Sequence, residues 1–326
     1  MQSIAFFNNK GGVGKTTLLC NVAAYVSIYC DKKVCVVDAD PQCNATQYFF
    51  EEDVVESIYD DDNAFTIYKI IEPLAAGEGY TKRLYTRKSK KFKVDVLPGD
   101  PRLALTEDLL AKDWEEAKAG GVRGMKTSLV FSELNSRLES YDYVFYDVSP
   151  SLGALNRAIM LSSDYFISPV SLDIFSLKAF ENIANWIEDW WGDWNRGILN
   201  IKGKGTPPDF RYSKPKFIGY VTQQYLAKKD SQGQKRAVMA YEKIRERIDG
   251  VIKKNNLADS ISSTQEYEIG TVPNLFSLVP MSQSNHTPIF QLSARDGVVG
   301  AHFSKVKDSK GIFEKVSLQL LDRTTP

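Results

Sequence analysis

The sequence predicts an α/β fold in which a mostly parallel sheet is covered by helices on both faces. Short apolar runs that have the character of buried strands alternate with longer segments of helical periodicity, a pattern typical of βαβ units. The predicted strands are, in chain order, 4–7, 33–38, 93–97, 143–147, 165–170 and 217–222. A glycine loop and two aspartates stand where three of these strands end. Because parallel strands share one carboxyl edge, we expect a ligand site there.

The first strand runs into the loop 10–17, KGGVGKTT, and a helical pattern begins at Leu18. Glycines let successive N–H groups form a nest for phosphate oxygens, and the positive end of the helix dipole adds to it. Lys15 can reach the β- and γ-phosphates, and the Thr16 hydroxyl can ligate Mg²⁺. The residues predicted to bind the nucleotide in this loop are Gly11, Gly12, Val13, Gly14, Lys15, Thr16 and Thr17.

The loop departs from the general phosphate-loop pattern at its front. Asn9 stands where that pattern has glycine, and Lys10 supplies a second lysine. This form resembles the deviant Walker A loop of the ParA/MinD family, whose fold is of the P-loop NTPase type. The resemblance implies that Lys10 reaches across a dimer interface to the nucleotide of the other subunit.

The second strand ends in the run DADPQCNAT, which begins at Asp38. By itself an Asx/Pro turn that closes a strand would look similar. The run resembles the ParA branch of the family, and the resemblance places Asp40 beside the attacking water and Asp38 near the metal shell. The predicted catalytic residues are therefore Lys10, Lys15 and Asp40.

Two later segments extend the resemblance. Asp147 opens the run DVSPSLG, which is similar to the family's Walker B segment, and the resemblance implies that Asp147 holds Mg²⁺ through a water. Ser149 stands where the family often has proline. The run TVPN resembles the segment that flanks adenine, which makes Pro273 a predicted nucleotide contact, although Asn274 replaces the usual arginine. The predicted metal site comprises Thr16, Asp38 and Asp147.

Composition excludes several other classes of protein. The 326 residues contain four cysteines, all before residue 44 and without a C-x-x-C pair, and only two histidines. We therefore expect neither a disulfide framework nor a zinc site, and we expect the protein to be located in a reducing cytoplasm. No signal peptide or membrane-spanning run is recognised. We expect one ParA-like domain over 1–326, with an inserted charged segment at about 51–92.

Charge is balanced overall, with 41 basic and 41 acidic residues, but not locally. The basic region at about 201–260 holds 14 basic and 6 acidic residues, whereas 81–93 holds seven basic residues and no acidic one. A basic face is the footprint of phosphate-backbone binding, although a solvated helix face gives the same pattern. Lys235, Arg236 and Lys243 are the predicted DNA contacts, without sequence preference because no base-reading motif is evident.

Two apolar features remain. Residues 310–321 have a helix-like apolar period that predicts a helix packed on the protein's own core, with a membrane anchor as the alternative. Four tryptophans between 186 and 194 indicate a core cluster or a contact surface.

Together these features predict a ParA-like ATPase that uses ATP and Mg²⁺, dimerises on ATP, binds DNA non-specifically and positions DNA or other cargo. The resemblance implies that a ParB-like or other partner protein stimulates hydrolysis. We expect a cytoplasmic protein, associated with the nucleoid where it binds DNA and not bound to membranes. The alternatives are a MinD-like switch on a membrane surface and a metabolic enzyme on the same fold. An iron-sulfur reductase is disfavoured because no cysteine follows Cys43.

Overall fold

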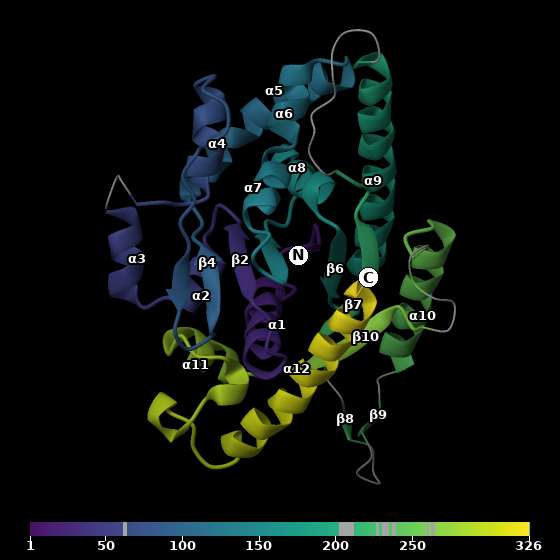
Figure 1. The fold of residues 1–326 in the computed structure, drawn as a ribbon. Coiled ribbons are helices and arrows are strands. Elements are labelled where there is room, and N and C mark those ends of the chain that lie inside the picture. Colours follow the sequence, from purple (N-terminus) through teal and green to yellow (C-terminus); the bar gives the residue numbers. More distant parts are fainter. Residues whose placement is uncertain are drawn as a thin grey trace.

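The computed structural model describes residues 1–60, 64–201, 212–225, 228–229, 235–236, 239–258, 261 and 265–325 (Figure 1). For the described residues from 224 to 241, only the backbone is described, without side chains.

An eight-stranded sheet forms the centre of the molecule (Figure 1). Its strands, in spatial order, are β10 (Glu268–Pro273), β7 (Lys216–Tyr225), β6 (Tyr165–Val170), β1 (Gln2–Phe6), β5 (Tyr143–Val148), β2 (Val34–Ala39), β4 (Val94–Leu97) and β3 (Arg87–Ser89). All neighbouring strands are parallel except the edge pair of β3 and β4, which is antiparallel. A separate two-stranded ribbon joins β8 (Lys228–Lys229) to β9 (Lys235–Arg236).

Helices connect these strands and cover the sheet. The α-helices are α1 (Lys15–Tyr29), α2 (Asn44–Phe49), α3 (Glu52–Tyr59), α4 (Tyr68–Ala75), α5 (Glu107–Lys118), α6 (Val122–Ser128), α7 (Val130–Arg137), α8 (Ala154–Ser162), α9 (Ile174–Ile201), α10 (Met239–Lys254), α11 (Leu278–Ser284) and α12 (His302–Thr324). Three 3₁₀ turns, at Pro101–Thr106, Ile289–Gln291 and Ala294–Asp296, complete the described elements.

Alternation along the strands gives the sheet two apolar faces. On β1, Ile4 and Phe6 pack with α1 and α12, whereas Ala5 on the same strand and Phe7 just after it pack with α5, α7, α8 and α9. Successive side chains of a strand point to opposite faces, so a strand buried on both sides is apolar throughout. Because the central strands are packed on both faces, their carboxyl ends have fixed positions along one edge of the sheet.

The predicted fold class and strands are confirmed, with differences at the sheet margins. The strand over 165–170 is reproduced as predicted. The edge strand β3 was not predicted, and the segment around Pro273, interpreted only as a nucleotide contact, belongs to strand β10.

The two apolar features also find their places. In α12, Phe313, Val316 and Leu320 are buried against the sheet, so the prediction of a helix packed on the core is confirmed. Trp190 and Trp194 are buried in the core, and the Trp194 ring stacks on Trp114 of α5 at 6.0 Å between centroids. No helix in the described part of the chain is long and apolar enough to cross a membrane.

Candidate functional site

The glycine loop lies between β1 and α1 at the carboxyl edge of the sheet. Gly12 and Gly14 have φ angles of 72° and 79°, in the left-handed region that glycine adopts readily. Gly14 is the residue that immediately precedes α1, so the first N–H groups of that helix face the loop. Ahead of the loop, Asn8 anchors it: its side chain donates to Pro169 O at 2.7 Å and accepts from Lys10 N at 2.9 Å. The backbone is thus preformed as a phosphate cradle.

Lys15 lies inside this cradle rather than in solvent. Its side chain is buried, and Nζ donates to Lys10 O at 3.2 Å, which folds the ammonium group back over the loop. Burial lowers the pKa of Lys15, and the carboxylates of Asp147 and Asp40 counteract this shift. A cation held here faces the position that a bound phosphate chain would take.

Thr16 and Asp147 form the expected pair for a metal. The Thr16 hydroxyl donates to Asp147 Oδ2 at 2.8 Å. Asp147 of β5 is level with Phe6 at the end of β1, so its carboxylate lies at the edge of the sheet where the glycine loop begins. Burial and the nearby carboxylate of Asp38 raise the pKa of Asp147 well above its usual range. The other oxygen, Asp147 Oδ1, is buried without a hydrogen-bond partner. An unpartnered carboxylate oxygen beside a hydroxyl fits Mg²⁺, which prefers few protein ligands plus waters and phosphate oxygens.

Asp38 and Asp40 have different surroundings although they are two residues apart. Asp38 is fully buried, and its Oδ2 accepts from Thr46 N at 2.7 Å and from Thr46 Oγ1 at 2.6 Å. Burial raises the pKa of Asp38 to about 7 despite these bonds. Asp40 accepts from Gln42 N at 2.9 Å and lines the pocket over the glycine loop. The geometry therefore makes Asp38 a link between β2 and α2, and leaves Asp40 as the carboxylate that faces the pocket.

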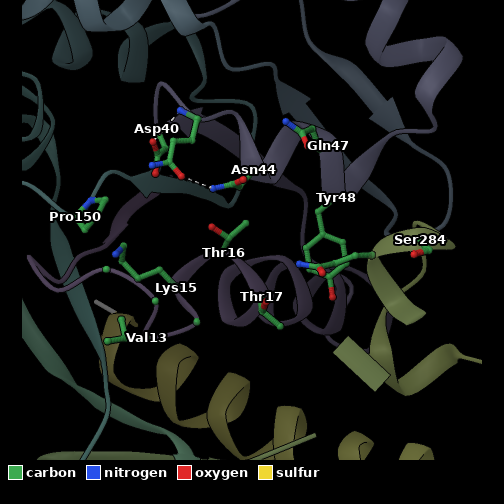
Figure 2. A pocket seen from close by; sticks show the side chains of 15 residues that line it. Val13, Lys15, Thr16, Thr17, Asp40, Asn44, Gln47, Tyr48, Pro150 and Ser284 are labelled. Atoms are coloured by element: carbon green, nitrogen blue, oxygen red, sulfur yellow. Dashed lines mark hydrogen bonds between the residues drawn. The ribbon is translucent and has the colours of Figure 1, made fainter. Parts of the chain in front are cut away.

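The pocket itself has a volume of about 720 Å³ and extends beyond the loop. Figure 2 shows Lys15, Thr16 and Asp40 around one end, and Tyr48 and Ser284 at the other end, past Thr17. The part of the wall that was not predicted from the sequence comes from α2 and the turn before it, from α11 and from the segment after β5: Gln42, Asn44, Gln47, Tyr48, Pro150, Gln283 and Ser284. Gln42 and Asn44 belong to the DADPQCNAT run, and Gln47 and Tyr48 follow it closely, so these residues could have been suspected. Nothing in the sequence indicated Gln283 or Ser284.

The other predicted residues lie apart from this wall. Lys10 forms an ion pair with Asp173, which immediately precedes α9. Its ammonium group also lies 5.9 Å from the ring centroid of Phe175, in the first turn of α9. Pro273 ends β10 and is not among the residues that line the pocket, so its contact with a nucleotide stays a prediction.

The predicted DNA contacts are only partly described. Lys235 and Arg236 form β9, but their side chains lie outside the described residues, as does all of 202–211 within the basic region. Lys243 is an exposed residue of α10.

The chain is similar to proteins that are already known. A family model described as an AAA domain matches residues 1–198. The chain belongs to this AAA domain family. Over 187 residues it is 32% identical to the sporulation initiation inhibitor protein Soj of Bacillus subtilis, and over 183 residues it is 28% identical to a virulence plasmid ParA family protein of Chlamydia psittaci. Each match covers 56% of this chain, together with 63% of Soj and 62% of the Chlamydia psittaci protein.

Solved structures share the fold of this chain. The crystal structure of protein DIP2308 from Corynebacterium diphtheriae has a TM-score of 0.71 and 32% identity, and the match covers 88% of this chain and 97% of that one. A plasmid partition protein from Borrelia burgdorferi bound to AMPPNP shares the fold at a TM-score of 0.59 and 18% identity, with 99% of both chains covered. The predicted ParA-like relationship is confirmed, and the chain spans about three fifths of the length of the curated relatives named above.

Proposed function

We propose that this member of the ParA-like AAA domain family is a Mg²⁺-dependent ATPase and an ATP-driven dimeric switch. One observation supports this most directly: the contact of Thr16 with Asp147 lies beside the buried Lys15 and leaves one carboxylate oxygen without a partner. Relatives are named as ParA family proteins, and one structure of the same fold is a complex with ATP. Release of phosphate from ATP, measured with Mg²⁺ and with a chelator instead, tests this proposal.

The chain's own residues divide the chemistry of hydrolysis among them. The N–H groups of the loop and the Lys15 ammonium bind the phosphate chain, and Thr16 with Asp147 would hold Mg²⁺, which neutralises charge on the phosphate oxygens when bound. Asp40 orients the attacking water. Slow turnover without a partner is expected, since assembly would supply the remaining positioning groups. Non-specific DNA and a ParB-like or other partner complete the proposed switch, which positions or partitions DNA or other cargo.

Replacement of Lys10 by alanine is expected to leave ATP binding by the monomer largely intact and to impair ATP-dependent dimerisation and hydrolysis. The physical reason is position: Lys10 is bound to Asp173 outside the pocket wall and can serve a second subunit only after this ion pair opens. Sedimentation with ATP and Mg²⁺ measures the dimer. Lys178→Ala, which removes an exposed lysine of α9, is the matched control. An undiminished dimer with normal turnover would contradict the role of Lys10 in trans.

DNA binding is expected to require ATP, to show no sequence preference and to weaken with salt. If each subunit makes roughly 3–4 phosphate contacts, log K should fall with log[salt] at a slope of about −6, from ~0.9 per phosphate. Reversing the charges of Lys235, Arg236 and Lys243 together should flatten this slope without affecting the dimer. Filter binding at several salt concentrations measures the slope, and charge reversal at three exposed lysines of α12, Lys305, Lys307 and Lys315, is the control. A full slope in the triple variant would show that the basic region is only a solvated surface.

A further inference from the structure

The basic run at 81–93 has no role in the function proposed above, and the structure places part of it around a second pocket. This pocket has a volume of about 410 Å³ and lies where the edge strand β3 meets the end of α2. Arg87, Lys88, Lys90 and Lys91 are among its lining residues, together with one carboxylate, that of Glu51. Such a surplus of basic groups over a concave surface attracts an anion.

One hydrogen bond shows which side of β3 faces α2. Ser89 Oγ donates to Phe49 O at 3.1 Å, so the side of β3 that carries Ser89 covers the end of α2. Since side chains alternate along a strand, Arg87 lies on the same side as Ser89, and Lys88 points to the opposite side. Arg87 can therefore place its guanidinium over the pocket from the side of β3 that faces α2, whereas Lys88 lines the pocket from the opposite side of the strand.

The basic side chains of the pocket differ in whether a carboxylate or a carbonyl oxygen already contacts them. Lys91 Nζ donates to Asn285 O at 2.7 Å and lies 3.6 Å from a carboxylate oxygen of Glu51, so its charge is already balanced. In the part of the chain that the structure describes, no carboxylate forms an ion pair with Arg87 or Lys90. These two cations are available to an incoming anion, and the planar donors of arginine suit phosphate oxygens.

The pocket is separate from the nucleotide site, yet the two share structural elements. Gln47 and Tyr48 of α2 line the nucleotide pocket, and Phe49, the next residue, lines this one. Beyond α11, His286 lines the second pocket, and its Nδ1 lies 3.1 Å from Gln47 O. The second pocket thus lies next to the part of the nucleotide pocket formed by α2, and none of its lining residues belongs to the phosphate cradle.

We infer that the pocket between β3 and the end of α2 binds a phosphate group through Arg87 and Lys90. The phosphate belongs either to a small free anion or to a nucleic-acid backbone. The alternative explanation is that the charges of β3 only keep this edge strand from pairing with another chain, a common use of lysine at sheet edges. The inference does not rest on the proposed ATPase activity, because the site lies outside the glycine loop.

Titration calorimetry of the full chain with pyrophosphate tests this site. The titration is done on Lys15→Ala, which weakens binding at the glycine loop. Each charged hydrogen bond is worth about tenfold in affinity, so Arg87→Gln with Lys90→Gln should weaken pyrophosphate binding at least about tenfold. Lys82→Gln with Arg83→Gln removes the same charge from two exposed residues of the same basic run that do not line the pocket, and should change affinity less than about threefold. Unchanged melting temperatures verify that the variants are folded.

A second arm distinguishes the two sources of phosphate. If the ligand is a nucleic-acid backbone, a 24-base-pair duplex displaces pyrophosphate, and Arg87→Gln with Lys90→Gln lowers the magnitude of the salt slope of duplex binding by about 1–2. If pyrophosphate binds and the duplex does not compete, the ligand is a small free anion. Absence of pyrophosphate binding, or an equal loss of affinity in the two double variants, would overturn the inference. Failure of wild type to bind DNA or to hydrolyse ATP would affect only the proposed function.

Discussion

Replacement of Lys15 by alanine is expected to abolish ATP binding. Lys15 is the buried cation of the glycine loop, and its ammonium group lies against Lys10 O and near the carboxylates of Asp147 and Asp40. A charged hydrogen bond contributes about 1.5–3 kcal/mol, and 1.4 kcal/mol is a factor of ten in affinity. If Lys15 contacts both the β- and γ-phosphates, its removal should weaken ATP binding roughly 10²–10⁴-fold.

Equilibrium binding of a fluorescent ATP analogue measures this loss. Alanine is a good helix former at the start of α1, so the variant should keep the helix and melt near the wild-type temperature. Lys32→Ala, which removes an exposed lysine beyond the other end of α1, is the control and should bind normally. Near-native affinity in Lys15→Ala would show that the glycine loop is not the phosphate site.

Much of the site could be predicted because its residues follow strands that are recognisable individually. Buried strands of a parallel sheet are continuous apolar runs, so the sequence predicted strand ends at Phe7, Asp38 and Asp147, each within one residue of the end in the structure. In the structure, Asp147 is level with Phe6 on one side and with Asp38 on the other. The convergence predicted from the rule for parallel sheets is therefore present.

The margins of the sheet could not be predicted for physical reasons. β3 has three residues, two of them basic, and gains its strand conformation only from pairing with β4. β10 pairs with β7 with shifts in register, and its apolar pattern is too short to distinguish from a loop. The wall residues Gln283 and Ser284 are polar, lie far along the chain from the motifs, and reach the pocket because α11 packs on α2. Such long-range packing leaves no local signal.

The division of roles between the two aspartates after β2 is the finding with the most direct catalytic consequence. Asp38 uses Oδ2 to accept two bonds from Thr46 and is fully buried, which ties α2 to the end of β2. Asp40 has a single backbone donor, Gln42 N, on Oδ1, and lines the pocket (Figure 2). Its carboxylate can therefore accept a further hydrogen bond from a water within the pocket, whereas Asp38 is not among the residues that line the pocket.

Replacement of Asp40 by alanine is accordingly expected to slow ATP hydrolysis about 10²–10⁴-fold, the usual range for a positioned acid or base. ATP binding should survive, because the glycine loop and Lys15 are unchanged, so the ATP-bound dimer should accumulate. Single-turnover phosphate release and size-exclusion chromatography with ATP measure the two effects. Asp40→Asn keeps the acceptor for Gln42 N but removes the negative charge, and it should be nearly as slow if the charge orients the water. Asp108→Ala, which removes an exposed carboxylate of α5, should hydrolyse ATP normally. Wild-type turnover in Asp40→Ala would mean that Asp40 only shapes the turn after β2, and that the water must be held by another group of the pocket wall.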